Sequence, residues 1–369
     1  MWQLTENRDW SSLKQQFTWV RDMEGVPQDS IHHAEGDVEI HTQMVINALV
    51  NLPEYQELDE QSKEILFVSA LMHDIEKRST TVVELDGKIT SAGHAKKGEK
   101  TVRKILYCDI PTPFFIREQI AKLVRYHGLP LWIFEKPNPQ KSLLEASFEV
   151  NTKLLAILAK ADVLGRICAD QEELLYKIDL FQAFCEEQNV WGKEKSFPSD
   201  LGKFNYFQKE NEHPDYEPFI NETFEVIMMS GIPGSGKDTY LKKYHKDLEI
   251  ISLDDIRRKY GISPTDKSGN GRVVQMAKEL AREMLRKKQP FAWNATNTSR
   301  QMREQLIGLF TTYGAKVKII YLEVPFKKLI NQNRNREYAV PDSVVLKLVE
   351  RLEIPSAYEA HETVFIVEK

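Results

Sequence analysis

Hydrophobic and polar positions recur with different periods in the two halves of the chain. In the first half, apolar residues recur at intervals of three and four, which predicts α-helices. Strand-like alternation is confined there to residues 80–89, around the turn sequence Asp86-Gly87, and predicts one β-hairpin. The helical segments are 61–71, 115–123, 143–164 and 172–184. The first half is therefore expected to be an all-helical bundle.

The second half is expected to fold as an α/β domain. Its apolar runs are short and are separated by segments with helical spacing, a pattern typical of a mostly parallel sheet. The predicted strands are 224–230, 248–253, 291–297, 316–323 and 363–367. Helices are predicted at 237–243, from 298 onward and at 342–352.

Length and composition divide the chain. A protein of 369 residues is too long for one ordinary core, so two domains of roughly 150–200 residues are expected. Between 196 and 222, three prolines and many polar residues interrupt the helical spacing. We interpret this segment as a linker or a wrapping segment. The predicted division is a helical domain at 1–195, a linker at 196–222 and an α/β domain at 223–369.

Composition excludes several classes of protein. No apolar run approaches the roughly 18 residues of a membrane span, and the first residues lack the order of a signal peptide. A cytoplasmic protein without a membrane partner is therefore expected. The three cysteines, Cys108, Cys168 and Cys185, have no Cys-x-x-Cys spacing, which argues against a disulfide framework and against a cysteine zinc site.

Charge is distributed unevenly along the chain. Taken alone, the net charge of −5 argues against a nucleic-acid partner. From Thr223 onward, however, 25 Lys and Arg stand against 18 Asp and Glu, whereas the preceding residues have 25 against 37. The second half therefore carries an excess of positive charge, which removes the objection to a nucleic acid there.

Histidines and aspartates recur in the first half. Most of the nine histidines lie between His32 and His127. An adjacent His-Asp pair on a helix is often only solvated, and both side chains reach a metal only in the groove that they flank, with other ligands from other helices. Imidazole and carboxylate suit first-row transition metals, which activate water for phosphoester hydrolysis. The segments concerned are IHHAEGDVEIHT (31–42), LMHDIEK (71–77), GHAKKG (93–98), RYHGLP (125–130) and KADVLGR (160–166).

This order of motifs resembles the HD phosphohydrolase superfamily over roughly residues 20–185. The segment HAEGDVEIHT is similar to the HD domain attached to bacterial tRNA nucleotidyltransferases. The resemblance implies two divalent transition metals such as Mn, Ni or Co, with Asp74 also acting in catalysis. Lys77 and Arg166 resemble phosphate-binding cations, and His33 is either a ligand or a phosphate contact; a surface or structural role is the alternative for all three. The implied metal ligands are His41, His73, Asp74, His94, His127 and Asp162.

The sequence GIPGSGKDT (231–239) follows the first predicted strand of the second half and leads into a helix. Glycines allow backbone N–H groups to curl around a phosphate, and Lys237 would reach the β- and γ-phosphates. Asp238 stands where Ser or Thr usually binds Mg²⁺, and a carboxylate is itself a good Mg²⁺ ligand. ATP, or another nucleoside triphosphate, with Mg²⁺ is therefore expected. The expected contacts are Gly231, Pro233, Gly234, Ser235, Gly236, Lys237, Asp238 and Thr239.

Asp254 and Arg257 follow the next predicted strand, at the carboxyl edge of the sheet. A kinase that phosphorylates a hydroxyl needs a carboxylate near the acceptor oxygen and cations near the phosphoryl group. With the Thr-Asn after the third strand and a basic segment before Val-Pro, the pattern resembles polynucleotide 5′-kinases over about 223–355. The resemblance implies that Asp254 is the general base, that Arg257 contacts the acceptor's phosphate, and that Arg334 and Arg336 close over ATP.

Some positions depart from this family or have a second interpretation. Ala295 stands where the family has an acidic residue, and Gln332 replaces a basic residue of the lid. Asp254 could instead be the N-cap of the following helix. Arg300 and Arg303, on a predicted helix, are interpreted as solvated charges.

The fusion restricts the substrate more than either half does. Many nucleases leave a 2′,3′-cyclic phosphate and a 5′-hydroxyl, while a ligase needs a 3′-hydroxyl and a 5′-phosphate. The whole chain resembles the bacterial HD-type end-healing enzymes, in which an HD 2′,3′-phosphatase precedes a polynucleotide 5′-kinase. The resemblance implies RNA or DNA ends as substrates and functional coupling to a ligase. The alternatives are a nucleotide phosphohydrolase fused to a small-metabolite kinase, and a nucleotide-sensing scaffold.

Overall fold

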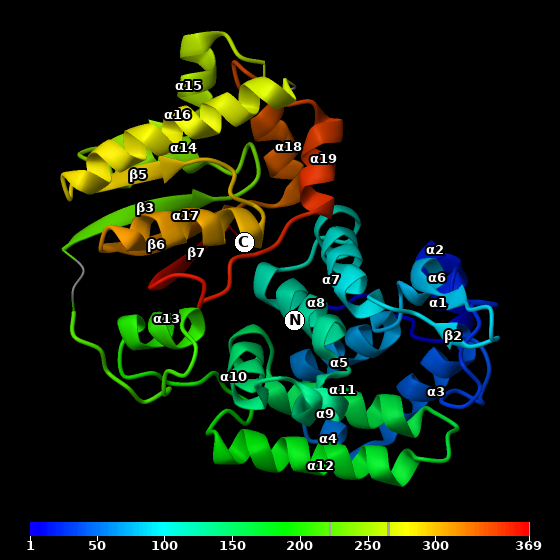
Figure 1. The fold of residues 1–369 in the computed structure, drawn as a ribbon. Helices are drawn as coiled ribbons and strands as arrows, with labels where there is room; N and C mark the ends of the chain where they lie inside the picture. The colour runs from blue at the N-terminus through cyan, green and yellow to red at the C-terminus, as the bar shows by residue number, and fades with distance from the viewer. Residues whose placement is uncertain (221–222, 264–265, 369) are drawn as a thin grey trace. The chain divides into compact units, whose positions relative to one another are not determined.

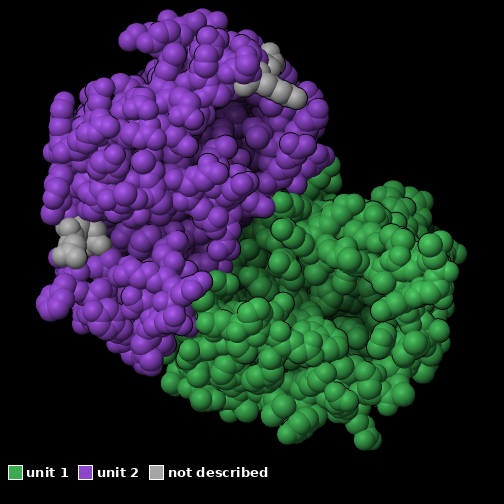
Figure 2. Space-filling view, viewed as in Figure 1, with its two compact units in different colours: residues 1–195 green, residues 196–369 purple. Residues whose placement is uncertain are grey.

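The chain divides into two compact units, at 1–195 and 196–369 (Figure 2). The computed structural model describes residues 1–220, 223–263 and 266–368. The first unit is mostly helical, and the second combines helices with a sheet (Figure 1). Within the described ranges, no helix combines the length and the apolar character that a membrane span requires.

Unit 1 is a bundle around α3 (Val38–Asn51), α5 (Glu60–Met72), α8 (Phe114–Tyr126) and α11 (Thr152–Leu164). Helix α11 packs against the other three. It is buried on nearly every side, as expected for a helix at the centre of a bundle. The other helical elements are α1 (Trp10–Gln16), α2 (Thr18–Arg21), α4 (Pro53–Gln56), α6 (Lys77–Thr80), α7 (His94–Lys104), the π-helical turn Ile105–Asp109, α9 (Leu129–Trp132), the 3₁₀ turn Ile133–Glu135, α10 (Pro139–Glu149) and α12 (Gln171–Glu187).

The predicted helices of unit 1 and its hairpin are confirmed. Strand β1 (Val82–Val83) pairs antiparallel with β2 (Ile89–Thr90) across the predicted turn. The apolar stretch 143–164 is divided between α10 and α11. Asn151 causes the break, because its side chain accepts hydrogen bonds from the first backbone N–H groups of α11 and caps that helix.

Unit 2 contains a five-stranded sheet with the order β4-β5-β3-β6-β7. In this order β3, the strand that precedes the glycine-rich loop, is central and pairs with a neighbour on each side. All pairings in the sheet are parallel, whereas the sequence predicts a mostly parallel sheet. The strands are β3 (Phe224–Ser230), β4 (Glu249–Ser252), β5 (Phe291–Asn294), β6 (Ala315–Glu323) and β7 (Glu362–Val367).

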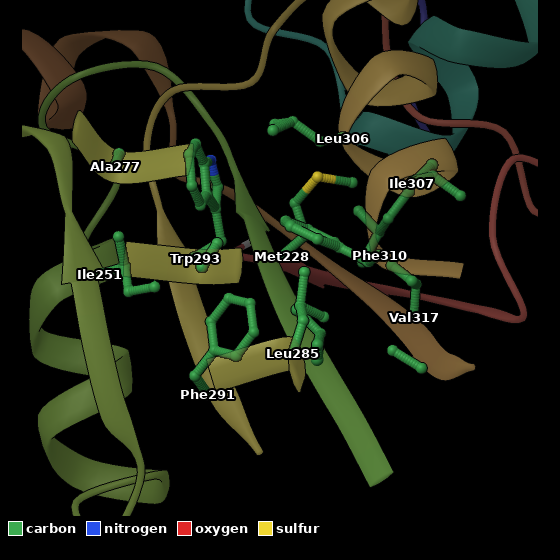
Figure 3. Close-up of a cluster of buried hydrophobic side chains, with 14 of the residues drawn as sticks. Met228, Ile251, Ala277, Leu285, Phe291, Trp293, Leu306, Ile307, Phe310 and Val317 are labelled. Carbon is green, nitrogen blue, oxygen red and sulfur yellow. The ribbon is translucent and has the colours of Figure 1, made fainter. Parts of the chain in front are cut away.

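Helices cover both faces of this sheet. Successive residues of β3 point to opposite faces. Val226 and Met228 join a core formed with α16 and α17, in which Figure 3 labels Met228. Ile227 and Met229 pack with α14 on the other face. Both faces are therefore apolar, as in other α/β domains. The helices of this unit are α13 (Asp200–Gln208), α14 (Lys237–Tyr244), α15 (Leu253–Tyr260), α16 (Lys267–Arg286), α17 (Arg300–Thr312), α18 (Phe326–Arg334) and α19 (Asp342–Glu350).

Helices α13, α16 and α18 of unit 2 were not predicted. In α16 the buried stripe is Val273, Ala277, Ala281 and Leu285, in which small alanines among many charged residues give a weak periodic signal. Helix α13 lies in the segment 196–222 that we interpret as a linker or a wrapping segment. Phe204 of α13 belongs to the core of unit 2, so this part of the segment packs onto the sheet domain.

Candidate functional site

Three helices of unit 1 bring His41, His73 and Asp162 together. His41 lies in α3, His73 directly follows α5 and Asp162 lies in α11. Nε2 of His41 is 3.1 Å from Oδ1 of Asp162 and 3.3 Å from Nε2 of His73. All three side chains are buried. Two imidazole nitrogens and a carboxylate oxygen thus converge in the interior of the unit.

Asp74, His94 and His127 form a second group. His94 begins α7 and His127 directly follows α8. Nε2 of His94 is 3.3 Å from Oδ1 of Asp74 and 3.3 Å from Nε2 of His127. The other oxygen of Asp74 lies 3.1 Å from Nε2 of His73 in the first group. The six residues predicted as metal ligands therefore form one continuous cluster, with Asp74 between its two halves.

Backbone carbonyls fix the orientation of three histidine rings. Nδ1 of His73, His94 and His127 lies 2.7–2.8 Å from the carbonyl oxygen of the residue three positions earlier. When Nδ1–H donates to that carbonyl, Nε2 keeps its lone pair for a metal. Burial, with the neighbouring histidines His94 and His73, lowers the pKa of His127 to about 3. Its ring is therefore neutral at pH 7, as a ligand must be.

Lys77 and Arg166 neutralise the two buried carboxylates. Nζ of Lys77 lies 2.8 Å from Oδ2 of Asp74, and Nε of Arg166 donates to Oδ1 of Asp162 at 3.1 Å. Burial alone would raise the pKa of both carboxyls. His73 and Lys77 nevertheless hold the pKa of Asp74 well below its usual range, and Arg166 with the neighbouring histidines does the same for Asp162.

This donor set fits divalent transition metals. In each group of three, the ligand atoms lie within 4.8 Å of one another. Oδ1 of Asp74 is buried and accepts no hydrogen bond from any residue in the described part of the chain. Leaving a carboxylate oxygen buried in this way is costly unless a cation binds it. The chemistry and the convergence of the residues both suit a cluster of two metals.

Glu35 belongs to the same site and was not predicted. Its Oε1 lies 2.8 Å from Nδ1 of His33 and 2.8 Å from Nδ1 of His41. Burial would raise the pKa of Glu35, but hydrogen bonds with the two histidines lower it. Burial lowers the pKa of His33 to about 4. The available signal was the place of Glu35 in the same motif, two residues after His33.

The glycine-rich loop of unit 2 takes a shape that only glycine allows. Gly231, Gly234 and Gly236 have φ values of 148°, 90° and 95°. A Cβ atom at Gly231 would lie 2.6 Å from the carbonyl oxygen of Leu322, and one at Gly234 would lie 2.7 Å from that of Leu329. The loop therefore packs closely against β6 and α18 before α14 begins.

Lys237 begins α14 and points back to this loop. Its Nζ donates to the carbonyl oxygens of Gly231 and Ile232 at 2.8 and 3.1 Å. Burial lowers the pKa of Lys237 to about 8. Pro233 and Ser235 are buried in the loop, while Asp238 and Thr239 are exposed in the first turn of α14.

Asn294, at the end of β5, was not predicted as a site residue. Its Nδ2 donates to Oδ1 of Asp238 at 2.6 Å. The amide thus orients the carboxylate that stands at the usual Mg²⁺ position. A carboxylate oxygen is a ligand that suits Mg²⁺, so the residues present fit this ion.

Asp254 lies on α15 beside Arg257. Nη1 of Arg257 donates to Oδ1 of Asp254 at 2.6 Å. The N-cap interpretation of Asp254 is wrong, because Ser252 occupies that position and its side chain accepts the N–H of Asp255. The carboxylate of Asp254 thus lies in the first turn of α15, is half exposed and is not used to cap the helix.

Arg336 lies between the carboxylate of Asp238, in α14, and that of Asp254, in α15. Its Nη2 lies 3.7 Å from Oδ2 of Asp238 and 3.6 Å from Oδ2 of Asp254. Arg334 is directed elsewhere, since its Nε donates to Oδ2 of Asp342 at 3.0 Å. Of the two arginines predicted to close over ATP, the structure brings only Arg336 to these carboxylates.

Arg303 is buried, which corrects its interpretation as a solvated charge. Its guanidinium donates to both carboxylate oxygens of Glu359, at 2.6 and 2.9 Å, and to the carbonyl oxygen of Asn297 at 3.0 Å. Asn297 has a positive φ of 44°, and the preceding carbonyl of Thr296 accepts the N–H of Gly231 at 2.9 Å. The buried ion pair thus supports the turn to which the glycine-rich loop is attached.

Known families cover part of each unit. Residues 38–167 match the HD domain family, and residues 226–355 match an AAA domain family. The first match spans the six clustered histidines and aspartates, and the second spans the glycine-rich loop, Asp254 and Arg336. Unit 1 therefore contains an HD domain and unit 2 has a P-loop kinase fold. Together they support an enzyme with phosphohydrolase and kinase activity that uses divalent metals and ATP with Mg²⁺.

Individual relatives are similar to parts of the chain. Over 138 residues, 35% of this chain, it is 24% identical to L-seryl-tRNA(Sec) kinase of Methanococcus maripaludis. Over 123 residues, 33% of this chain, it is 32% identical to the multifunctional CCA protein of Methylococcus capsulatus. The matches span 53% of the first relative and 26% of the second. Among solved structures, a gluconokinase from Sinorhizobium meliloti is 17% identical and covers 40% of this chain and 83% of its own, with a TM-score of 0.29.

Proposed function

We propose that the protein heals the ends of broken nucleic acids. The HD domain removes a 2′,3′-cyclic phosphate or a 2′- or 3′-phosphate, and the kinase domain transfers the γ-phosphate of ATP to a polynucleotide 5′-hydroxyl. One observation carries the proposal: a single chain joins a six-ligand HD cluster to a P-loop site in which Arg257 and Arg336 face the acceptor carboxylate Asp254. These activities act on the two ends of one break, and their products are the ends that a ligase joins.

In the HD domain, metals such as Mn, Ni or Co, held by the six clustered residues, would supply Lewis acidity toward phosphate and water. Oriented imidazoles and carboxylates are the chain's own contribution to this chemistry. Lys77 and Arg166 are the cations beside the cluster and are assigned to the phosphate, together with His33. In hydrolysis a water oxygen bonds to phosphorus, the bond from phosphorus to the ribose oxygen breaks, and that oxygen takes up a proton.

In the kinase domain, Asp254 takes the proton of the 5′-hydroxyl. The hydroxyl oxygen then bonds to the γ-phosphorus, the bond from that phosphorus to the β,γ-bridging oxygen breaks, and ADP leaves. Lys237 and Arg336 compensate the charge on the phosphates, and Arg257 binds the acceptor's phosphate. Asp238, which Asn294 orients, would hold Mg²⁺.

Two further observations support a polynucleotide acceptor. Residues from Thr223 onward carry more basic than acidic side chains, as suits a phosphodiester chain. One relative is named as a kinase of seryl-tRNA, and its similarity supports an acceptor hydroxyl that belongs to a nucleic-acid adduct. A kinase of small metabolites would not need this excess of basic side chains, because a small acceptor has no extended phosphodiester chain to bind.

Mapping both ends of one oligonucleotide tests the proposal. The oligonucleotide carries a 5′-hydroxyl and either a 3′-phosphate or a 2′,3′-cyclic phosphate, and is incubated with ATP, Mg²⁺ and a panel of Mn²⁺, Ni²⁺ and Co²⁺. We expect a gain of 5′-phosphate and a loss of the 3′-terminal phosphate. Lys237→Ala should abolish the first change only, and His73→Ala the second only. Asp247→Asn, an exposed carboxylate outside both sites, is the control.

Other outcomes contradict the proposal in distinguishable ways. Turnover of ATP with small hydroxyl metabolites but not with oligonucleotides would identify a metabolite kinase. Binding of nucleotides without turnover in either domain would identify a sensor. Because phosphate contacts release counterions, phosphorylation of oligonucleotides should also weaken steeply as salt rises.

A further inference from the structure

An exposed tyrosine lies next to the carboxylates of the kinase site. Tyr338 is 57% exposed and follows Arg336 by two residues. Arg336 itself lies within 3.7 Å of both Asp238 and Asp254. The backbone that carries the tyrosine therefore passes beside the place where the loop helix α14 and the acceptor helix α15 present their carboxylates.

Arg258 holds this ring from the acceptor side. Its Cζ lies 5.4 Å from the centroid of the Tyr338 ring, within the range of a cation–π contact. Arg258 belongs to α15, one turn after Asp254, and forms an ion pair with Asp255. The ring is thus fixed by the helix that carries the proposed general base, and not by α14, which follows the phosphate-binding loop.

We infer that Tyr338 and Arg258 form a stacking surface for the nucleobase of the acceptor's 5′-terminal nucleotide. This inference rests on the proposed function, because it names how the same kinase site holds its substrate. With a guanidinium on one face, the exposed remainder of the ring offers a flat aromatic surface, which is what a base stacks on. Stacking on an aromatic ring accepts every base, so it suits an enzyme that must act on ends of any sequence.

The position of the pair favours the acceptor base over the adenine of ATP. The phosphates of ATP are directed to the loop and to the N-terminus of α14. The acceptor hydroxyl must instead reach Asp254, whose helix also supplies Arg258. We therefore place the base of a nucleotide whose 5′-oxygen reaches Asp254 against the ring that Arg258 of the same helix contacts.

The stacking surface predicts a dependence on the first base. An oligonucleotide with an abasic first residue should be phosphorylated by the native protein with a kcat/KM about tenfold lower than the matched normal oligonucleotide, mainly through KM. Tyr338→Ala should lower kcat/KM on the normal oligonucleotide about tenfold and should treat the two oligonucleotides alike. Tyr338→Phe keeps the ring and should behave as the native protein does.

Controls separate this effect from others. Tyr260→Ala removes an exposed tyrosine at the end of α15 and should change neither oligonucleotide's kinetics. The KM for ATP should stay constant in all variants. If Tyr338→Ala raises the KM for ATP and leaves the acceptor unaffected, the ring serves the donor nucleotide and the inference is wrong. Equal activity of native protein and Tyr338→Ala on both oligonucleotides also overturns it, while failure of the native protein to phosphorylate any oligonucleotide overturns the proposed function itself.

Discussion

The two candidate sites differ most in how their charged groups are held. In the HD cluster the side chains of Asp74 and Asp162 are 2% and 1% exposed, whereas those of Asp238 and Asp254 in the kinase site are 56% and 54% exposed. Carbonyls and cations fix the HD residues in place. In the kinase site, Asn294 and Arg257 each hold one oxygen of Asp238 and Asp254 at 2.6 Å, but the other oxygens face solvent and Arg336 at more than 3.5 Å. The buried residues of the first site suit ions that stay bound, whereas the exposed residues of the second site are free to rearrange when a substrate binds.

This difference decides how each site should fail. Burying charges is costly, so the HD cluster depends on every partner being present, and the loss of one carboxylate disturbs all the others. The exposed kinase groups are solvated by themselves, so their loss should affect chemistry more than folding. The predictions below test this contrast, from the largest expected effect to the smallest.

The largest effect is expected from Asp74→Asn. Asp74 is the carboxylate shared by the two halves of the HD cluster, and an amide at this position cannot supply the charge that two metals require. We expect phosphatase activity to fall about 10³-fold or more and the metal content to drop, with kinase activity unchanged. Elemental analysis of the purified variant and end mapping of an oligonucleotide measure these quantities.

His32→Ala is the matched control for this prediction. His32 is exposed and lies in the same histidine-rich motif, outside the six-ligand set. Its metal content and both activities should equal those of the native protein. A parallel loss of kinase activity in Asp74→Asn would show that the two sites are not independent.

The next effect concerns the stability of unit 2. Removing the buried guanidinium with Arg303→Ala leaves Glu359 as an uncompensated buried charge, and we expect a loss of about 3–5 kcal/mol in the free energy of unfolding of this unit. Hydrogen exchange measured by mass spectrometry reports each unit separately. The β3 and β5 peptides should lose protection, while phosphatase activity persists.

Arg282→Ala, which removes an exposed ion pair with Glu279, is the control for Arg303→Ala. It should change stability by less than about 0.5 kcal/mol. If both variants had equal effects, the buried pair would not support the loop. Loss of protection in unit 1 would count against separate units.

The sequence singled out the six residues that the structure brings together in unit 1 because each one sits in a short local motif. A His-Asp pair, or a histidine before a glycine, can be found without knowledge of which helices meet. Glu35 was not predicted because only its contact with His41 in the folded chain indicates a role. In the sequence it resembles any surface carboxylate. The loop and its lysine were found for the same local reason as the histidines.

In the kinase site, local motifs were not enough to identify every residue that holds the site together. Arg303 has the spacing of a surface arginine on α17, and only its partner 56 residues later explains its burial. Asn294 likewise acts through Asp238, which lies on another element. Long-range polar contacts have no periodic signal along the chain, so neither residue could be assigned before the strands were placed side by side.

We expect acid to lower the free energy of unfolding of unit 2 because His361 is buried as a neutral ring. This ring stacks on Phe204 of α13 and accepts the N–H of Val317 at 3.1 Å, and burial lowers its pKa to about 4 from an ordinary 6.5. Between pH 6.5 and about 4, the His361 ring is protonated in the unfolded chain but neutral in the folded protein. The free energy of unfolding therefore decreases as the pH is lowered from 6.5 to 4, by about 3 kcal/mol in all. Below pH 4 this group contributes no further change.

His361→Asn tests this assignment. The asparagine side chain offers an oxygen near the position of Nδ1 and has no titration in this range. Between pH 6.5 and 4, the free energy of unfolding of unit 2 should depend less steeply on pH in this variant than in the native protein, by the contribution of His361. Chemical denaturation followed by hydrogen exchange in the β6 peptide measures it, and an unchanged pH slope would remove His361 as the cause.

The smallest effect probes how completely the HD cluster is organised. Glu35 accepts from Nδ1 of His41, so its charge orients that ring and makes Nε2 more basic toward a metal. In Glu35→Gln the amide oxygen can still accept a hydrogen bond but carries no charge. We expect metal affinity, measured by calorimetric titration of the metal-free protein with Mn²⁺, to fall about tenfold. Glu39→Gln, on the helix that carries His41 but paired with Lys14, should bind as the native protein does. Unchanged affinity in Glu35→Gln would mean that the carbonyl of Gly165, 3.3 Å from the same Nδ1, suffices to orient His41, and that the buried site tolerates the loss of an outer charge as the exposed one does.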